Sequence, residues 1–215
     1  MKKIVVPAVI AKSQEELDGI LEKISGNADL VQLDIMDGHF VPNQSLDFEF
    51  QLPRGKCIYE AHLMVNDPDK WIKSFGKRMD TIIAHFESPT TSPSTIKLIK
   101  SIGKKAALAL NPETIIEQIA DYLDDLDQVL IMTVNPGFYG SPFLPEIMAK
   151  IIKLRQIRPE LDIEVDGGIK PETIAMVDQA GANLFVSGSY LVKSDNMRER
   201  IDILYRMIQD VELPA

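Results

Sequence analysis

The sequence predicts an α/β protein that folds as a (β/α)8 TIM barrel, and three observations lead there. Eight short runs rich in β-branched and apolar residues alternate with amphipathic stretches along the whole chain. The 215 residues suffice for eight such units, at the short end of the range of roughly 200 to 400 residues for this fold. No linker or low-complexity tract divides the chain, so we expect residues 1–215 to form one domain. A doubly wound open sheet is the alternative that the same alternation allows.

Eight strands are expected, at residues 4–10, 30–36, 58–64, 81–85, 106–110, 128–134, 161–166 and 184–188. Because side chains alternate along a strand, each run divides into an apolar set and a second set. The second sets of three of these runs contain polar residues: Gln32, Asp34 and Met36; Glu60, His62 and Met64; Asp162, Glu164 and Asp166. Since helices cover the outside of a barrel, these polar sets should face its interior.

Helix signals fill most of the connections between the strands. Ser13 and Glu16 form a capping box before an apolar face at residues 17–24. Prolines near a first helical position and glycines at a helix end mark further helices: Pro68, Pro93, Pro112, Pro171, Gly103 and Gly181. Residues 46–55 differ, because their apolar residues alternate with period two, and we expect a short extra strand there.

The composition excludes several classes of protein. With 45% hydrophobic and 26% charged residues, the chain is typical of a globular core under a polar shell. A net charge of −9 without a Lys/Arg cluster argues against nucleic acid and anionic membranes as partners. The apolar runs are shorter than the roughly 20 residues of a membrane-spanning helix, and the apolar start is too short for a secretory signal, so we expect a cytoplasmic location. A single cysteine, Cys57, excludes an internal disulfide and a multi-cysteine zinc site.

Three ionisable residues fall at the carboxyl ends of expected strands, where barrels carry their active sites: Asp34, His62 and Asp166. A carboxylate inside a barrel is costly unless it is paired, hydrogen-bonded or bound to a metal. The set could therefore hold a divalent cation such as zinc, iron, manganese or cobalt, with the amide oxygen of Gln32 as a fourth ligand that favours harder ions such as Mn²⁺ or Mg²⁺. A buried polar network without a metal is the alternative.

Three glycine-bearing turns follow the sixth, seventh and eighth expected strands, at residues 135–140, 166–168 and 187–189. Exposed backbone N–H groups in such turns favour an anion, and barrels commonly bind phosphate after their last two strands. A phosphate could thus be held despite the net negative charge. The candidate substrate contacts in these turns are Gly137, Phe138, Tyr139, Gly140, Gly167, Gly168, Gly188 and Ser189.

Other residues at the strand ends have two interpretations each. Met36, Met64 and Met132 could form the floor of a substrate pocket or belong to the ordinary core. His39 could close over a ligand or cap a turn, and His85 with Glu87 is favoured as a structural pair over a ligand.

The motifs at these strand ends resemble those of the ribulose-phosphate 3-epimerase family. They are the segments 33–43 (LDIMDGHFVPN), 62–65 (HLMV), 132–138 (MTVNPGF), 163–168 (IEVDGG) and 186–189 (VSGS). The resemblance implies a phosphate-binding barrel that interconverts ribulose 5-phosphate and xylulose 5-phosphate by inversion at C3. It implies Asp34 and Asp166 as the two bases, a divalent cation on the two substrate oxygens, substrate contacts that include His62, and a homo-oligomer.

Three residues depart from the family pattern. Gln32 replaces a metal-binding histidine, Ala8 replaces a substrate-contacting serine, and Tyr139 stands in the phosphate loop where the family has glycine. These departures leave two alternatives open: an epimerase of another ketose phosphate, and a non-catalytic sugar-phosphate binder with a degenerate metal site. A decarboxylase of the phosphate-barrel group is disfavoured, since Met36 occupies the position of its lysine.

Overall fold

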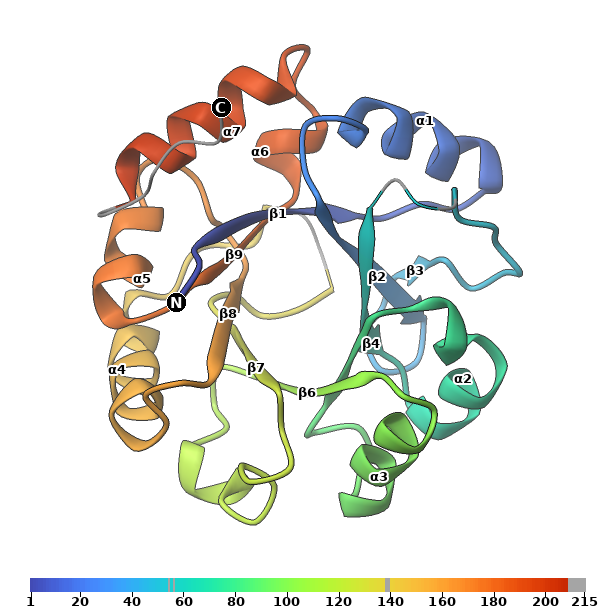
Figure 1. Ribbon diagram of the computed structural model, residues 1–215, viewed down its shortest axis with the longest axis vertical. Helices are drawn as coiled ribbons and strands as arrows, with labels where there is room; N and C mark the ends of the chain where they lie inside the picture. Colours follow the sequence, from blue (N-terminus) through green and yellow to red (C-terminus); the bar gives the residue numbers. More distant parts are fainter. Residues whose placement is uncertain (54, 56, 138–139, 209–215) are drawn as a thin grey trace.

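The computed structural model of the chain describes residues 1–53, 55, 57–137 and 140–208. Its sheet closes on itself, because β1 (Ile4–Val9) pairs in parallel with β9 (Leu184–Ser187) on one side and with β2 (Leu30–Asp37) on the other. Helices surround the ring of strands (Figure 1). The closed parallel sheet confirms the predicted barrel and contradicts the doubly wound alternative. That residues 1–215 form a single domain stays a prediction.

The remaining barrel strands are β4 (Ile58–Met64), β5 (Thr81–His85), β6 (Lys105–Leu110), β7 (Gln128–Met132) and β8 (Asp162–Asp166). All eight predicted strands are present, with ends that differ from the prediction by at most two residues. A ninth strand, β3 (Gln44–Ser45), pairs antiparallel with the end of β2, so that Met36 lies opposite Ser45.

The extra strand predicted at residues 46–55 was wrong. The extended segment is β3, just before this range, and Leu46 breaks it with a left-handed φ of 51°. Leu46 and Phe50 are buried in the outer core. The period-two pattern thus reports burial of alternate side chains in an irregular segment, which has no neighbouring strand for a ladder.

The helices are α1 (Gln14–Ile24), α2 (Pro68–Phe75), α3 (Pro93–Ser101), α4 (Met148–Ile157), α5 (Ile174–Ala180), α6 (Ser189–Val192) and α7 (Met197–Met207). Short 3₁₀ turns are η1 (Gly76–Arg78), η2 (Ile116–Ile119) and η3 (Pro145–Ile147). Ser13 accepts a hydrogen bond from the Glu16 N–H at the start of α1, as its capping pattern predicts. Pro68 and Pro93 begin their helices, and Gly181 ends α5 in a left-handed conformation.

The helix expected after Pro112 is absent from the described residues, and η2 stands in its place. The Nζ of Lys150 donates to the carbonyl oxygens of Asn111 and Pro112, at 2.8 Å each. These are the oxygens that would accept the first hydrogen bonds of a helix starting there. The Asn111 oxygen also accepts from the backbone N–H of Thr114, as in a single turn. At the other marked proline, Pro171, the helix starts only at Ile174.

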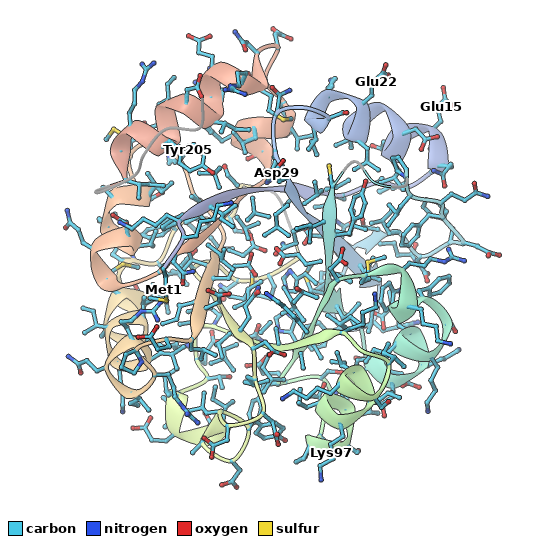
Figure 2. All side chains as sticks on the ribbon, viewed as in Figure 1. Met1, Glu15, Glu22, Asp29, Lys97 and Tyr205 are labelled. Carbon is cyan, nitrogen blue, oxygen red and sulfur yellow. The ribbon has the colours of Figure 1, made fainter. Side chains whose placement is uncertain are left out.

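The two faces of the strands build different layers. Apolar residues such as Leu33, Leu63 and Val165 belong to the large core between strands and helices. The opposite faces point into the barrel, where Gln32, Glu60, His62 and Glu164 are fully buried (0% exposed). Figure 2 shows side chains filling the ring of strands, while the labelled Glu15, Glu22 and Lys97 point away from it.

Among the described residues, no helix combines the length and the apolar character that a membrane crossing needs.

Candidate active site

Asp34, His62 and Asp166 meet inside the barrel at the carboxyl ends of β2, β4 and β8. Parallel pairing of β2 with β4 places Asp34 directly beside His62, and Asp166 is the last residue of β8. The Nδ1 atom of His62 lies 3.3 Å from Asp34 Oδ1 and 3.4 Å from Asp166 Oδ2. One imidazole nitrogen thus contacts both carboxylates, as the strand-end positions predict.

Gln32 completes this cluster from β2. Its Nε2 donates hydrogen bonds to Asp34 Oδ1 at 2.8 Å and to Asp166 Oδ2 at 2.9 Å, and it lies 3.4 Å from His62 Nδ1. Its Oε1 is buried and has no hydrogen-bond partner among the described residues. The amide of Gln32 therefore bridges the two carboxylates with one end and leaves its other end unsatisfied.

The buried setting shifts the protonation of these groups. Burial raises the pKa of Asp34, although hydrogen bonds with His62 and Gln32 oppose the shift. Burial alone would lower the pKa of His62, but hydrogen bonds to Asp166 and Asp34 and their charges raise it to about 9. In this arrangement His62 is an imidazolium at neutral pH and balances the charge of the carboxylates.

A second pair of residues lies behind His62. Its Nε2 is 2.9 Å from Nε2 of His85, and Nδ1 of His85 is 3.1 Å from Glu87 Oε2. Burial lowers the pKa of His85 to about 4. Hydrogen bonds from His85 and Thr114 outweigh the burial of Glu87 and lower the pKa of its carboxyl. The structural pair that the sequence favours is present, and it contacts the cluster directly.

A cavity of about 340 Å³ opens above the two carboxylates. Asp34 and Asp166 form part of its wall together with Ala8, Met36, Met64 and Met132. His62 is fully buried behind them and is not among the lining residues. A sugar-sized ligand in this cavity would touch both carboxylates and an apolar floor of methionine side chains.

The glycine turns form a further part of the cavity rim, through Gly137, Gly140, Gly167, Gly168, Gly188 and Ser189. Gly167 has a φ of 120°, and a Cβ on it would lie 2.4 Å from the Val134 side chain. Only glycine therefore allows this approach of the backbone to the cavity. Phe138 and Tyr139, which the sequence also suggests as contacts, lie outside the described residues.

Several lining residues escaped the sequence reasoning: Ile10, Val134, Pro136, Ser141, Pro142, Phe143, Ile169, Lys170, Val186 and Tyr190. Lys170 lies two positions after Gly168 and Tyr190 directly follows Ser189, so proximity to the glycine turns is the signal that could have found them. His39 is exposed in the loop after β2, where its N–H donates to Asp37 Oδ1 at 2.8 Å.

The donor atoms of Asp34, His62 and Asp166 all lie within 4.8 Å of one another, as a set that could hold a metal ion. The same motifs carry a family match, because the sequence profile of the ribulose-phosphate 3 epimerase family matches residues 4–192. The chain belongs to this family. Proteins named ribulose-phosphate 3-epimerase from Eremothecium gossypii and Bacillus subtilis are 34% and 38% identical to it. The first alignment covers 98% of the chain and 95% of the relative, and the second covers 92% and 95%.

Solved structures of other enzymes share the fold. A 3-hexulose-6-phosphate synthase superposes with a TM-score of 0.66 at 17% identity, over 95% of this chain and 99% of that one. A 3-keto-L-gulonate-6-phosphate decarboxylase from Vibrio cholerae superposes with a TM-score of 0.67 at 12% identity, over 96% and 97%. These likenesses support the barrel, whereas the family assignment rests on the sequence. As a member of the ribulose-phosphate 3-epimerase family, the chain is an epimerase, an enzyme of the isomerase class.

Proposed function

We propose that this epimerase interconverts ribulose 5-phosphate and xylulose 5-phosphate, with Asp34 and Asp166 as the two acid/base residues. The observation that carries the proposal is the presence of two carboxylates, from β2 and β8, in the wall of one cavity. Inversion at a carbon next to a ketone needs a proton removed from one face and returned to the other. Two carboxylates on different strands are suited to these two steps, one on each face of the carbon.

The proton balance follows from this arrangement. One carboxylate takes the C3 proton, and the electron pair moves into the C2 carbonyl to give an enediolate. The other residue, in its acid form, returns a proton to the opposite face of C3 and becomes a carboxylate. Burial raises the pKa of Asp34, which favours its acid form and suits it to return that proton.

The residues of the cluster fit a divalent cation. Ligand atoms around a small divalent cation, at roughly 2.0–2.2 Å from it, lie about 3 Å from one another. His62 Nδ1 lies 3.3 Å from Asp34 Oδ1 and 3.4 Å from Asp166 Oδ2, and the donor atoms of all three residues lie within 4.8 Å of one another. Rotation of the Gln32 amide by half a turn would direct its unsatisfied Oε1 at the cluster as an oxygen ligand. When bound there, the cation supplies Lewis-acid stabilisation of the enediolate oxygens.

The phosphate is assigned to the rim formed by the glycine turns. Gly167, Gly168 and Gly188 line the cavity, where backbone N–H groups can donate to an anion. Lys170 stands at the same rim and adds a positive charge. This local arrangement offsets the net charge of −9, which would otherwise repel a sugar phosphate.

The test is exchange of the C3 hydrogen in heavy water. Protein supplied with Mn²⁺ and ribulose 5-phosphate should incorporate deuterium at C3 and produce xylulose 5-phosphate. Asp34→Asn and Asp166→Asn should each lower the epimerisation rate roughly 10²- to 10⁴-fold. Asp162→Asn, at the other end of β8 and bonded there to Asn183, is the matched control and should retain activity. No exchange by the wild-type protein would overturn the proposal.

A second candidate, an epimerase of another ketose phosphate, is favoured by one observation. Ala8 lines the cavity where the family pattern has a serine, so the wall offers no hydroxyl at that position. A panel that includes six-carbon ketose phosphates would decide, and a preference for ribulose 5-phosphate would reject this candidate. Binding without turnover would instead indicate a non-catalytic sugar-phosphate binder. The homo-oligomeric state and the cytoplasmic location stay predictions.

A further inference from the structure

A line of hydrogen bonds runs from the carboxylate pair to a residue outside the cavity wall. His62 faces Asp34 and Asp166 with Nδ1 and faces His85 with Nε2. His85 reaches Glu87 with its other nitrogen. The two imidazole rings are stacked, with centroids 5.0 Å apart and an interplanar angle of 25°. The line thus joins β4, β5 and the loop after β5.

Glu87 fixes the direction of the hydrogen bonds along this line. Its Oε1 accepts from the backbone N–H of Asn111 at 2.9 Å and from the hydroxyl of Thr114. Because a carboxylate only accepts, its Oε2 accepts from Nδ1–H of His85. The Nε2 of His85 then carries a lone pair and accepts from Nε2–H of His62.

We propose that His85 and Glu87 are positioning residues, which fix the tautomer and orientation of His62 so that its Nδ1 is presented to a divalent cation held with Asp34 and Asp166. The inference rests on the proposed function, because the role of that cation is part of that proposal. Metal-binding histidines commonly donate their second ring N–H to a carboxylate or carbonyl oxygen. In this chain a second imidazole stands between the ligand histidine and its carboxylate, and Phe40 packs against that imidazole at a centroid distance of 4.8 Å.

Two substitutions of His85 separate positioning from packing. His85→Leu removes the acceptor for Nε2–H of His62, whereas His85→Gln keeps an acceptor through its amide oxygen. We expect His85→Leu to weaken Mn²⁺ binding about 10- to 100-fold and His85→Gln to restore it to within a few-fold of wild type. Ser88→Ala is the matched control, because Ser88 lies in the same loop but bonds to the Val65 and Asn66 carbonyls instead.

Glu87→Gln tests the direction of the line. The amide oxygen would accept from Asn111 and Thr114, as Oε1 of Glu87 does, and its NH₂ group would donate to Nδ1 of His85. The proton of His85 would then move to Nε2, which can no longer accept from His62. We expect this variant to lose Mn²⁺ affinity to a similar extent, although it leaves the volume of the side chain nearly unchanged.

Mn²⁺ binding is measured by the electron paramagnetic resonance of the free ion, with thermal unfolding alongside to confirm the fold. Nitrogen-15 spectra of the rings give the tautomers directly, since the chain has only three histidines. Wild-type His85 should carry its proton on Nδ1. A proton on Nε2 of His85, no Mn²⁺ binding by wild type, or wild-type affinity in folded His85→Leu would each overturn the inference.

Neither readout uses a sugar phosphate, so the two proposals can fail separately. The expected tautomers and affinities without turnover of ribulose 5-phosphate would overturn the proposed function alone. Turnover together with unchanged Mn²⁺ affinity in His85→Leu and Glu87→Gln would overturn the positioning role alone.

Discussion

Two glutamines occupy similar positions at two levels of the barrel interior, with different consequences. At the carboxyl end, Gln32 Nε2 donates to Asp34 and Asp166, at 2.8 and 2.9 Å. One level deeper, Gln128 Nε2 lies 2.5 Å from Glu164 Oε2 and 3.5 Å from Glu60 Oε2. We call Asp34 and Asp166 the upper carboxyl pair, and Glu60 and Glu164 the lower carboxyl pair. Each places an amide N–H group between two acidic side chains contributed by different strands.

The two pairs differ in their access to the cavity and in whether a histidine side chain contacts them. Glu60 and Glu164 are sealed in the interior, and burial raises the pKa of both, that of Glu164 well above its usual range. Burial therefore favours the protonated form of the lower pair. The upper pair lines the cavity and has the imidazole of His62 against both carboxylates. Access to the cavity and one histidine therefore distinguish the pair proposed for catalysis from the sealed pair below it.

The largest expected difference is in catalysis. Asp166→Asn removes one of the two proposed acid/base groups and should lower the epimerisation rate roughly 10²- to 10⁴-fold. Glu164→Gln, two residues earlier on the same strand, keeps hydrogen-bonding capacity at the lower pair and should change the rate less than about 10-fold. Steady-state rates with ribulose 5-phosphate measure both. Equal losses in the two variants would mean that the lower pair takes part in the chemistry.

Metal affinity should distinguish the pairs next. Gln32→His replaces an amide that must rotate before it can bind a cation by an imidazole nitrogen, a better ligand for first-row metals. We expect Zn²⁺ and Mn²⁺ to bind at least about 10-fold more tightly, since even changes to residues that only support a ligand alter metal affinity 10- to 100-fold. Titration calorimetry measures the change. Gln128→Met alters the lower pair in a comparable way and should leave both affinities near the wild-type values.

The strand pattern in the sequence predicts that the upper pair and His62 lie together. Alternation along a strand fixes which side chains face inward, so Asp34, His62 and Asp166 could be assigned to one end of the interior before any contact was known. The period-two segment at residues 46–55 misled, because alternate burial does not require a neighbouring strand. After Pro112 a proline alone does not start a helix, and the carbonyl oxygens there bond to Lys150, a tertiary contact that no local pattern records.

The lower pair and the line through His85 were harder to predict. The sequence assigns Glu60 and Glu164 to inward faces, but their shared contact with Gln128 depends on which strands lie near each other in the closed barrel. His85 and Glu87 are two positions apart in the sequence, which predicts that they pair. Their contact with His62 depends on the β4–β5 pairing and on the orientation of both rings.

The pH dependence of stability should separate the pairs by a smaller effect. Because the folded protein raises the pKa of Glu164 above 4.5, its contribution to stability is complete below about pH 4.5 and is lost as the pH rises through the folded pKa. Each unit of raised pKa corresponds to about 1.4 kcal/mol. Glu164→Gln should therefore lose less stability than wild type between pH 5 and pH 8. Urea unfolding at the two pH values tests this, and parallel losses would contradict a proton held by the lower pair.

The smallest expected difference is in the free energy of unfolding when each glutamine is replaced, measured in metal-free protein. Gln128→Met leaves two sealed carboxyl groups without their donor and should lower the free energy of unfolding by about 1–3 kcal/mol. Gln32→Met removes the same kind of donor, but His62 and water in the cavity still reach Asp34 and Asp166, so its cost should be below about 1 kcal/mol. Urea unfolding in the presence of a chelator measures both. A larger loss for Gln32→Met would mean that its amide, rather than His62, carries the balance of charge in the upper pair.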